Sequence, residues 1–249
     1  MTLSPMRTVK EMHLRSVLLA TAALIAAGAS LAVLRSNAEV AHSIPARAID
    51  EQVMLGSEPA SEVAVLAGGC FWGVQGVFQH VKGVDSAVSG YSGGTLANPS
   101  YEQVGTETTG HAESVKVTFD PKQVSYGKLL QIFFSVVHNP TELNYQGNDQ
   151  GTSYRSALFV MNDGQKKVAE AYIAQLDAAK LFPAKIVTEV TPYTNFYQAE
   201  DYHQDAATTI NINPGYITAM DLPKIANLKT MFPELWREKP RLVFASNGS

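Results

Sequence analysis

The chain has a single cysteine, Cys70, within the stretch AGGCFWGVQGVF. Two glycines precede the thiol, and Phe71 and Trp72 follow it directly. At the start of a helix a cysteine meets free backbone N–H groups and the positive end of the helix dipole, which favour the thiolate. We therefore expect Cys70 to be a nucleophile with a lowered pKa. The alternative is a small buried core residue, as many free cysteines are.

Aromatic side chains surround this candidate nucleophile in the sequence. Phe71 and Trp72 are core residues in most helices, but beside a thiol two rings can also form an apolar cage for a methyl group. Tyr101 and Tyr154 lie in polar, glycine-containing stretches. Their hydroxyls are candidates to donate hydrogen bonds to a substrate oxygen.

A candidate acid, Glu113, lies in the alternating segment HAESVKVTFDP. Alternation puts His111, Glu113 and Val115 on one face of a strand. A carboxyl on an apolar face is desolvated unless it lies at the open end of the sheet, and desolvation keeps it protonated near neutrality. Such a group can act as a general acid. The alternative is a Glu paired with a surface cation, and His111 either orients Glu113 or fills space.

Apolar periodicity predicts the elements that must position these residues. Strands are expected at residues 62–69, 83–92, 111–119, 155–161 and 185–193. Helices are expected at residues 70–81, 125–137, 163–180 and 222–236, with a long polar loop at 138–154. This order predicts an α/β chain of the α+β two-layer type, in which helices pack on a mixed sheet with a ferredoxin-like core and long loops surround the site.

Charge and composition exclude several function classes. The net charge is -4 and no long run of one sign occurs, whereas nucleic-acid binding requires a basic face. No Cys and His residues have the spacing of a zinc site. We therefore expect neither a nucleic-acid partner nor a bound metal.

The first residues have the pattern of an export signal. Arg7, Lys10 and Arg15 precede an apolar run at residues 16–34 that is rich in small side chains. We expect residues 1–38 to be a cleaved signal peptide or an uncleaved membrane anchor, and residues 39–61 to be a linker. Both interpretations place the domain outside the cytoplasm, in the periplasm or at the membrane. The third interpretation is that the start codon is misassigned and the product is cytosolic.

Six segments resemble, in order, the signature segments of the peptide methionine sulfoxide reductase A family. They are GCFWG, GYSGG, NPSYEQV, TGHAESV, QGNDQGTSYRS and AEDYHQ. They identify residues 62–205 as a catalytic domain. The stretch PGYITAMDLPKIANLKTMFPELW is similar to a C-terminal extension in one branch of the family, so residues 206–249 are expected to be an extension that lacks a resolving cysteine.

The resemblance implies a role for each matching residue. Cys70 would attack the sulfoxide sulfur, and Glu113 would protonate the sulfoxide oxygen. Phe71 and Trp72 would hold the substrate methyl group. The products would be methionine and a sulfenic acid on Cys70.

Further residues would bind or support the substrate. Tyr101 and Tyr154 would donate hydrogen bonds to the sulfoxide oxygen, and Asp149 would orient the substrate. His203 matches a family position near the site. Apart from the resemblance, the strand pattern makes His111 a candidate supporting residue beside Glu113.

The resemblance also implies the substrates and partners. The substrate would be the S epimer of methionine sulfoxide, in oxidised proteins or free, and no cofactor would be needed. We expect the chain itself to be a monomer. Because this sequence has no second cysteine, an external thiol would have to reduce the sulfenic acid. The candidates are thioredoxin, glutaredoxin with glutathione, and dithiothreitol. Two further departures are Gly105, where some relatives have a cysteine, and Gln75, where relatives commonly have Glu.

Three other functions remain open from the residues alone. A cysteine hydrolase would pair Cys70 with His80, His111 or His203. A thiol peroxidase would consume peroxide, and a binding module would bury Cys70 as an inert core residue.

Overall fold

The computed structural model describes residues 41–45 and 60–244. The predicted signal or anchor at residues 1–38 and most of the predicted linker lie outside the described residues. Within residues 41–45 and 60–244, none of the helices is long and apolar enough to cross a bilayer.

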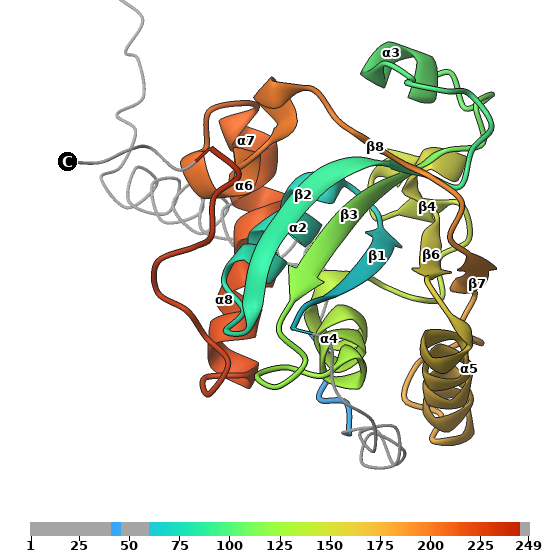
Figure 1. Ribbon diagram of the computed structural model, residues 1–249, viewed down its shortest axis with the longest axis vertical. Helices are drawn as coiled ribbons and strands as arrows, with labels where there is room; N and C mark the ends of the chain where they lie inside the picture. The colour runs from blue at the N-terminus through green and yellow to red at the C-terminus, as the bar shows by residue number, and fades with distance from the viewer. Residues whose placement is uncertain (1–40, 46–59, 245–249) are drawn as a thin grey trace, which may run out of the picture. The chain divides into compact units, whose positions relative to one another are not determined.

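The described chain folds around a six-stranded sheet, and the helices pack on this sheet (Figure 1). Its strands lie side by side in the order β7-β6-β1-β3-β2-β8. Their bounds are β1 Glu62–Gly68, β2 Val84–Ser92, β3 Ala112–Phe119, β6 Ser156–Val160, β7 Glu189–Pro192 and β8 Phe196–Gln198. In this sheet β6 and β7 are parallel, and the other neighbouring pairs are antiparallel.

The inner strands form the predicted ferredoxin-like core. Helix α2 (Phe71–Gln79) connects β1 to β2, and α4 (Tyr126–Ile132) lies between β3 and β6. The strands of each pair are separated in the sheet by one antiparallel strand, which is the split βαβ arrangement. The predicted mixed sheet with packed helices is therefore confirmed. Edge strand β8 was not predicted, since three residues are too few to show an alternating pattern.

One face of the sheet carries the main core. Val115, Val117 and Phe119 of β3 are fully buried there, as their alternation predicted. Helix α5 (Asp163–Ala178) joins α2 and α4 in covering this face and contributes the buried Tyr172 and Leu176. A smaller cluster on other strand positions comprises Val65, Ala67, Ala112, Ala157 and Phe159.

Several element boundaries differ from the prediction. The helix expected at 125–137 continues from α4 as a π-helical turn, Phe133–Val137. The expected strand at 185–193 pairs only over β7. Helix α8 (Leu222–Met231) ends before the expected residue 236, because Pro233 has no backbone N–H and restricts Phe232 to non-helical conformations.

The predicted long loop has its own short elements. A two-stranded ladder pairs β4 (Tyr145–Gln146) with β5 (Asp149–Gln150). A 3₁₀ turn, Thr152–Tyr154, then leads into β6. Earlier in the chain, the short helix α3 (Tyr101–Val104) begins at Ser100 with a capping box. These elements bring both candidate tyrosines to defined positions.

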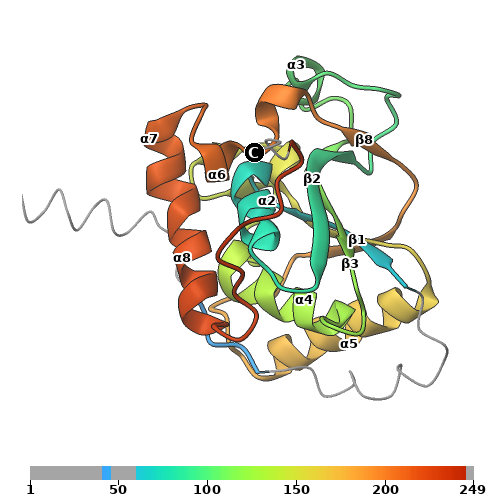
Figure 2. The same cartoon turned by 60° about the vertical axis from the view of Figure 1, so that its left-hand side comes forward.

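Helical segments within residues 206–231 pack against α2. This region comprises α6 (Ala206–Thr209), α7 (Pro214–Tyr216), a π-helical turn Ile217–Asp221 and α8. Figure 2 shows α2 between α8 and the sheet. Gly76 permits this close approach, since a Cβ there would lie 2.7 Å from Ile225 Cδ1 and 3.1 Å from Ala207 Cβ.

We expect Gly76→Val to destabilise the fold by about 1–3 kcal/mol, because the extra methyl groups would overpack the contact between α2 and the extension. Gly215→Val is the matched control, since a Cβ at Gly215 meets no atom within 4 Å. Denaturant unfolding of both variants provides the measurement. Equal loss in the two variants would contradict the packing explanation.

Candidate active site

Cys70 lies at the junction between β1 and α2, as the sequence predicted. It is the N-cap residue of α2. Gly69, just before it, has φ +84°, and a Cβ there would lie 2.7 Å from Gln146 Cβ. Glycine is therefore required for the sharp turn that places the thiol at the helix start.

The structure brings the candidate residues together around one cavity. Its volume is about 120 Å³. The lining residues are Cys70, Phe71, Trp72, Tyr101, Glu113, Asp149, Tyr154, Asn213 and Tyr216. All of the predicted nucleophile, acid, ring, phenol and orienting residues are among them, although they come from segments far apart in the sequence.

Glu113 is held at the start of α2. The backbone N–H of Phe71 donates a hydrogen bond to Glu113 Oε2 at 3.0 Å. Burial nevertheless raises the pKa of Glu113 to about 8, and the negative charges of Asp149 and Asp221 act in the same direction. The Phe71 hydrogen bond opposes the shift. Glu113 is therefore protonated at neutral pH and can donate a proton.

The pKa of Cys70 differs from the prediction. Burial raises it well above the ordinary value of a thiol, and negative charge on Glu113 and Asp221 raises it further. The backbone N–H of Trp72 lowers it, but by less. The expected lowering was wrong because the predicted helix-start effect is real but smaller than the cost of burying a thiolate. The resting site therefore holds a protonated thiol opposite a protonated acid.

The two predicted phenols interact with each other and face this acid. Burial raises the pKa of Tyr101 to about 12, nearby charge on Glu113 and Cys70 adds to the rise, and hydrogen bonding with Tyr154 opposes it. Burial also raises the pKa of Tyr154. Both hydroxyls therefore keep their protons at neutral pH and can donate hydrogen bonds within the cavity.

The C-terminal extension contributes cavity residues that the sequence did not predict. The Tyr216 hydroxyl donates a hydrogen bond to Asp149 Oδ2, and its ring lies edge-on to Trp72 with centroids 5.9 Å apart. Asn213 caps α7 and lines the same cavity. The Asn-Pro pair at 213–214 is a helix-start signal. No local signal, however, indicates that this helix faces Cys70.

His203 lies behind the cavity. Its Nδ1 accepts a hydrogen bond from Trp72 Nε1 at 3.1 Å. Its ring lies 5.1 Å from Phe71 and 4.5 Å from Tyr101, centroid to centroid. Burial lowers its pKa, so the neutral ring can accept from Trp72. His203 thus packs against three cavity-lining rings.

Both ring nitrogens of His111 form hydrogen bonds with a neighbouring loop. Gly94 N–H donates to its Nδ1 at 3.1 Å, and its Nε2 donates to the Leu96 carbonyl at 2.8 Å. Both ring nitrogens are used, so His111 holds the 94–96 loop rather than orienting Glu113. Of the two readings left open by the sequence, the structure supports the packing role.

Gln75 has a role specific to an amide. Its Nε2 donates to the Ala87 carbonyl at 3.0 Å and to Gln204 Oε1 at 2.8 Å. Its Oε1 accepts from Asp205 N–H at 2.8 Å. A carboxylate cannot donate these two bonds, so Gln75 suits this particular link between α2 and the segment after His203.

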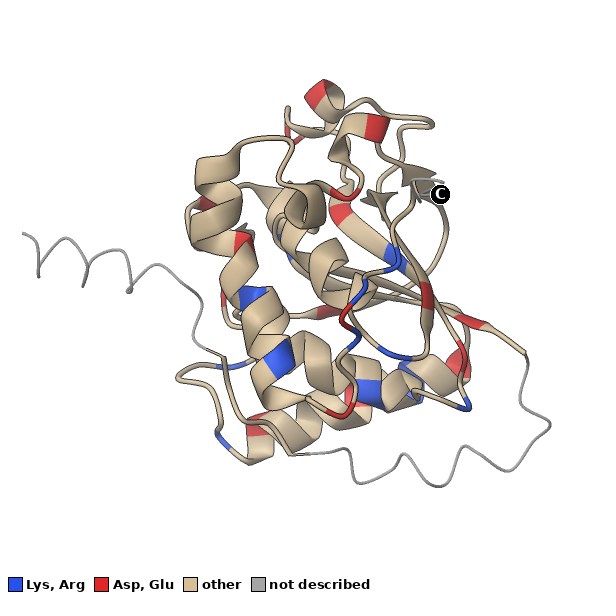
Figure 3. Cartoon of the chain, turned by 90° about the vertical axis from the view of Figure 1, so that its left-hand side faces the viewer, with Lys and Arg blue, Asp and Glu red and all other residues tan. Residues whose placement is uncertain are grey.

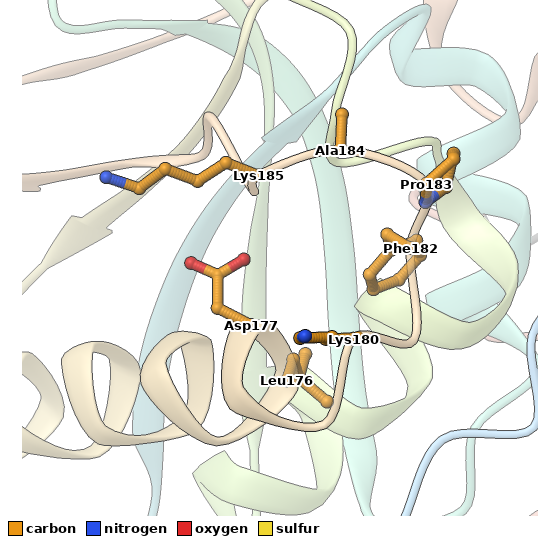
Figure 4. Close-up of a pocket in the computed structure, with 7 residues that line it drawn as sticks. All are labelled: Leu176, Asp177, Lys180, Phe182, Pro183, Ala184 and Lys185. Atoms are coloured by element: carbon orange, nitrogen blue, oxygen red, sulfur yellow. The ribbon is translucent and has the colours of Figure 1, made fainter.

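A second, larger cavity lacks this chemistry. It has a volume of about 630 Å³ and lies at the end of α5 and in the loop that follows (Figure 4). Its lining residues are Leu176, Asp177, Lys180, Phe182, Pro183, Ala184 and Lys185. It shares no lining residue with the Cys70 cavity. In the ribbon view of Figure 3, acidic and basic positions both occur along the described chain, and neither kind is confined to one element.

Comparison with known proteins gives a consistent result. The family model described as peptide methionine sulfoxide reductase matches residues 62–234. The chain is 60% identical over 190 residues to peptide methionine sulfoxide reductase MsrA 2 of Mesorhizobium japonicum, an alignment that covers 76% of this chain and 97% of that protein. It is 49% identical to MsrA of Pasteurella multocida over 71% of this chain and 99% of that protein.

Solved structures show the same similarity. Methionine sulfoxide reductase A of Corynebacterium diphtheriae has 31% identity and a TM-score of 0.53, covering 72% of this chain and 89% of that chain. Reduced Mxr1 of Saccharomyces cerevisiae has 32% identity and a TM-score of 0.54, covering 65% and 91%. With the matched segment spanning Cys70, Glu113 and Tyr216, the chain belongs to the peptide methionine sulfoxide reductase family.

Proposed function

We propose that this protein reduces methionine sulfoxide in oxidised peptides and proteins, and free methionine sulfoxide, to methionine, and that it acts on the S epimer. The observation that carries the proposal is the composition of the Cys70 cavity. It contains one thiol, a carboxyl that is protonated at neutral pH, protonated phenols and two apolar rings. A sulfoxide has a methyl group, an electrophilic sulfur and a basic oxygen, which these groups match.

In the proposed reaction the sulfur of Cys70 attacks the sulfoxide sulfur while Glu113 gives its proton to the oxygen. The hydroxyls of Tyr101 and Tyr154 stabilise the charge that develops on that oxygen. Phe71 and Trp72 hold the methyl group. The thiol proton replaces the one that Glu113 gave, so the site ends with the charge with which it began.

One cysteine is enough to supply the two electrons that the reduction requires. The methionine sulfur gains two electrons, the Cys70 sulfur loses two, and the oxygen is transferred to give a sulfenic acid. Within these 249 residues Cys70 is the only cysteine. An external thiol such as thioredoxin, glutaredoxin with glutathione, or dithiothreitol then reduces the sulfenic acid and releases water.

The geometry disfavours a cysteine hydrolase. That mechanism requires a histidine within hydrogen-bond reach of the thiol. In the described part of the chain, the residues that line the Cys70 cavity include no histidine. His203 contacts Trp72 through Nδ1, and His80 Nδ1 is bonded to the Arg237 carbonyl.

Separated epimers of a methionine sulfoxide peptide test the function. With dithiothreitol as reductant, we expect methionine to form from the S epimer and not from the R epimer. Turnover of the R epimer alone would overturn the stereochemical assignment. Turnover of peroxide or of an ester, with neither epimer reduced, would overturn the proposed activity.

We propose in addition that the protein acts as a monomer outside the cytoplasm. The basic residues before the apolar run at 16–34 support export. N-terminal sequencing of the membrane and soluble fractions distinguishes an anchor from a cleaved signal. Light scattering of the purified protein gives the oligomeric state.

A further inference from the structure

Glu107 accepts an unusual set of hydrogen bonds from the turn that carries Tyr154. Its Oε2 accepts from the Thr152 hydroxyl and from Ser153 N–H, each at 2.8 Å. Its Oε1 accepts from the Ser153 hydroxyl at 2.6 Å. Although burial alone would raise the pKa of Glu107, these bonds lower it overall. Glu107 is therefore a carboxylate that binds the first residues of the 3₁₀ turn.

The local backbone is shaped around this carboxylate. Glu107 itself has φ +63°, in the left-handed region that non-glycine residues seldom adopt. On the opposite side, Gly151 has φ +134°, and a Cβ there would collide with the Glu107 carboxyl group. The left-handed backbone of Glu107 and the lack of a side chain at Gly151 therefore both allow the Glu107 carboxylate to reach the 152–154 turn.

A second link joins the same two segments in the opposite direction. Arg155 Nη2 donates to the Gly110 carbonyl at 3.0 Å, and its Nη1 donates to the Thr152 carbonyl at 2.9 Å. Residues 107–110 lead directly into β3, which carries Glu113. The two links thus tie the entry to the acid's strand to the turn that holds Tyr154.

We propose that Glu107 is a positioning residue that holds the Tyr154 hydroxyl in the cavity opposite Glu113. This inference rests on the proposed sulfoxide reductase function. Glu107 does not line the cavity. Its hydrogen bonds run to the turn that carries Tyr154, and its charge also raises the pKa of Glu113, an effect that would persist without the Tyr154 hydroxyl. Because the Tyr154 hydroxyl stabilises charge that develops on the oxygen only during reaction, the loss of Glu107 should lower kcat rather than raise KM.

A double-mutant cycle separates this role from a general structural one. The single-turnover rate of methionine formation is measured for wild type, Glu107→Gln, Tyr154→Phe and the double variant. We expect Glu107→Gln to slow wild type about tenfold, since small misplacements of catalytic groups have effects of this order or larger. In the Tyr154→Phe background it should slow the rate less than about twofold, because there is no hydroxyl left to position.

Two further variants control for charge and strain. Glu170→Gln removes an equivalent charge from the exposed surface of α5, where Glu170 has only a weak ion pair with Lys166, and should leave the rate unchanged. Glu107→Gly permits the left-handed backbone but has no carboxylate, so it should be as slow as Glu107→Gln. A full rate in Glu107→Gly would show that strain relief, and not the carboxylate, matters.

The possible outcomes distinguish the positioning role of Glu107 from the proposed reductase function. If wild type forms methionine but the two substitutions multiply their effects in the double variant, Glu107 has no positioning role for Tyr154. Loss of the thermal unfolding transition in Glu107→Gln and Glu107→Gly would likewise make it a folding residue. If wild type forms no methionine, the proposed function itself fails.

Discussion

Cys70→Ser is expected to leave no sulfoxide reduction above the uncatalysed background. A serine hydroxyl is far less nucleophilic than a thiol, and its oxygen cannot form the sulfenic acid that carries the oxygen away. The measurement is methionine formed per chain with excess dithiothreitol. Multiple turnovers by the serine variant would contradict the nucleophile assignment.

The serine variant should fold normally, which makes its loss of activity interpretable. Cys70 is the N-cap of α2 and has no side-chain cap hydrogen bond, whereas serine is among the preferred N-cap residues. We therefore expect its melting temperature to equal or exceed that of wild type. Cys70→Ala, which removes the polar atom at this cap position, should be equally inactive but no more stable than wild type.

Glu113→Gln is expected to slow the reductive step by roughly 10²-fold or more, the usual scale for a positioned proton donor. The amide keeps an oxygen that can accept the hydrogen bond from Phe71 N–H, but it has no acidic proton. Single-turnover kinetics with saturating substrate at neutral pH isolate this step. A wild-type rate in the variant would remove Glu113 from the mechanism.

The pH dependence of the same variant gives a second test. The pKa of Glu113 rises from an ordinary 4.5 to about 8 in the folded chain, so the wild-type rate should fall as pH rises through about 8. The rate of Glu113→Gln should not show this fall. If the wild-type rate instead rises through pH 8 because the thiol ionises, Cys70 and not Glu113 controls the reaction.

The stability of the folded chain should also fall as the pH rises. Between the two pKa values the folded state retains a proton on Glu113 that the unfolded state has lost, so stability decreases as pH rises from 4.5 to about 8. Glu113→Gln should therefore raise the melting temperature at pH 8.5 and change it least near pH 4. Equal effects at both values would contradict the burial of a protonated acid.

Local patterns predicted much of the fold because they report on burial. The alternation of Val115, Val117 and Phe119 determined which face of β3 meets the helices. The glycines before Cys70 indicated the turn from β1 into α2. In both cases the signal and the structure involve residues close together in the sequence, and the order of elements then allowed few topologies.

Effects that depend on tertiary contacts were not predictable in the same way. Whether a helix start lowers or raises the Cys70 pKa depends on how completely the thiol is buried, and Glu113 and Asp221 contribute from distant segments. The position of Tyr216 in the cavity wall follows from the packing of α8 on α2, and the link from Glu107 to Ser153 joins two loops. No periodicity marks such contacts.

Single-turnover reaction in the absence of any reductant tests the central assignment most directly. With an excess of a peptide containing S-methionine sulfoxide, we expect one methionine to form per chain, since Cys70 is the one cysteine in the sequence. Mass spectrometry should find Cys70 heavier by one oxygen atom, or trapped as a sulfenic acid adduct. Verified methionine formation with Cys70 still an unmodified thiol would contradict the assignment of Cys70 as the residue that takes up the oxygen.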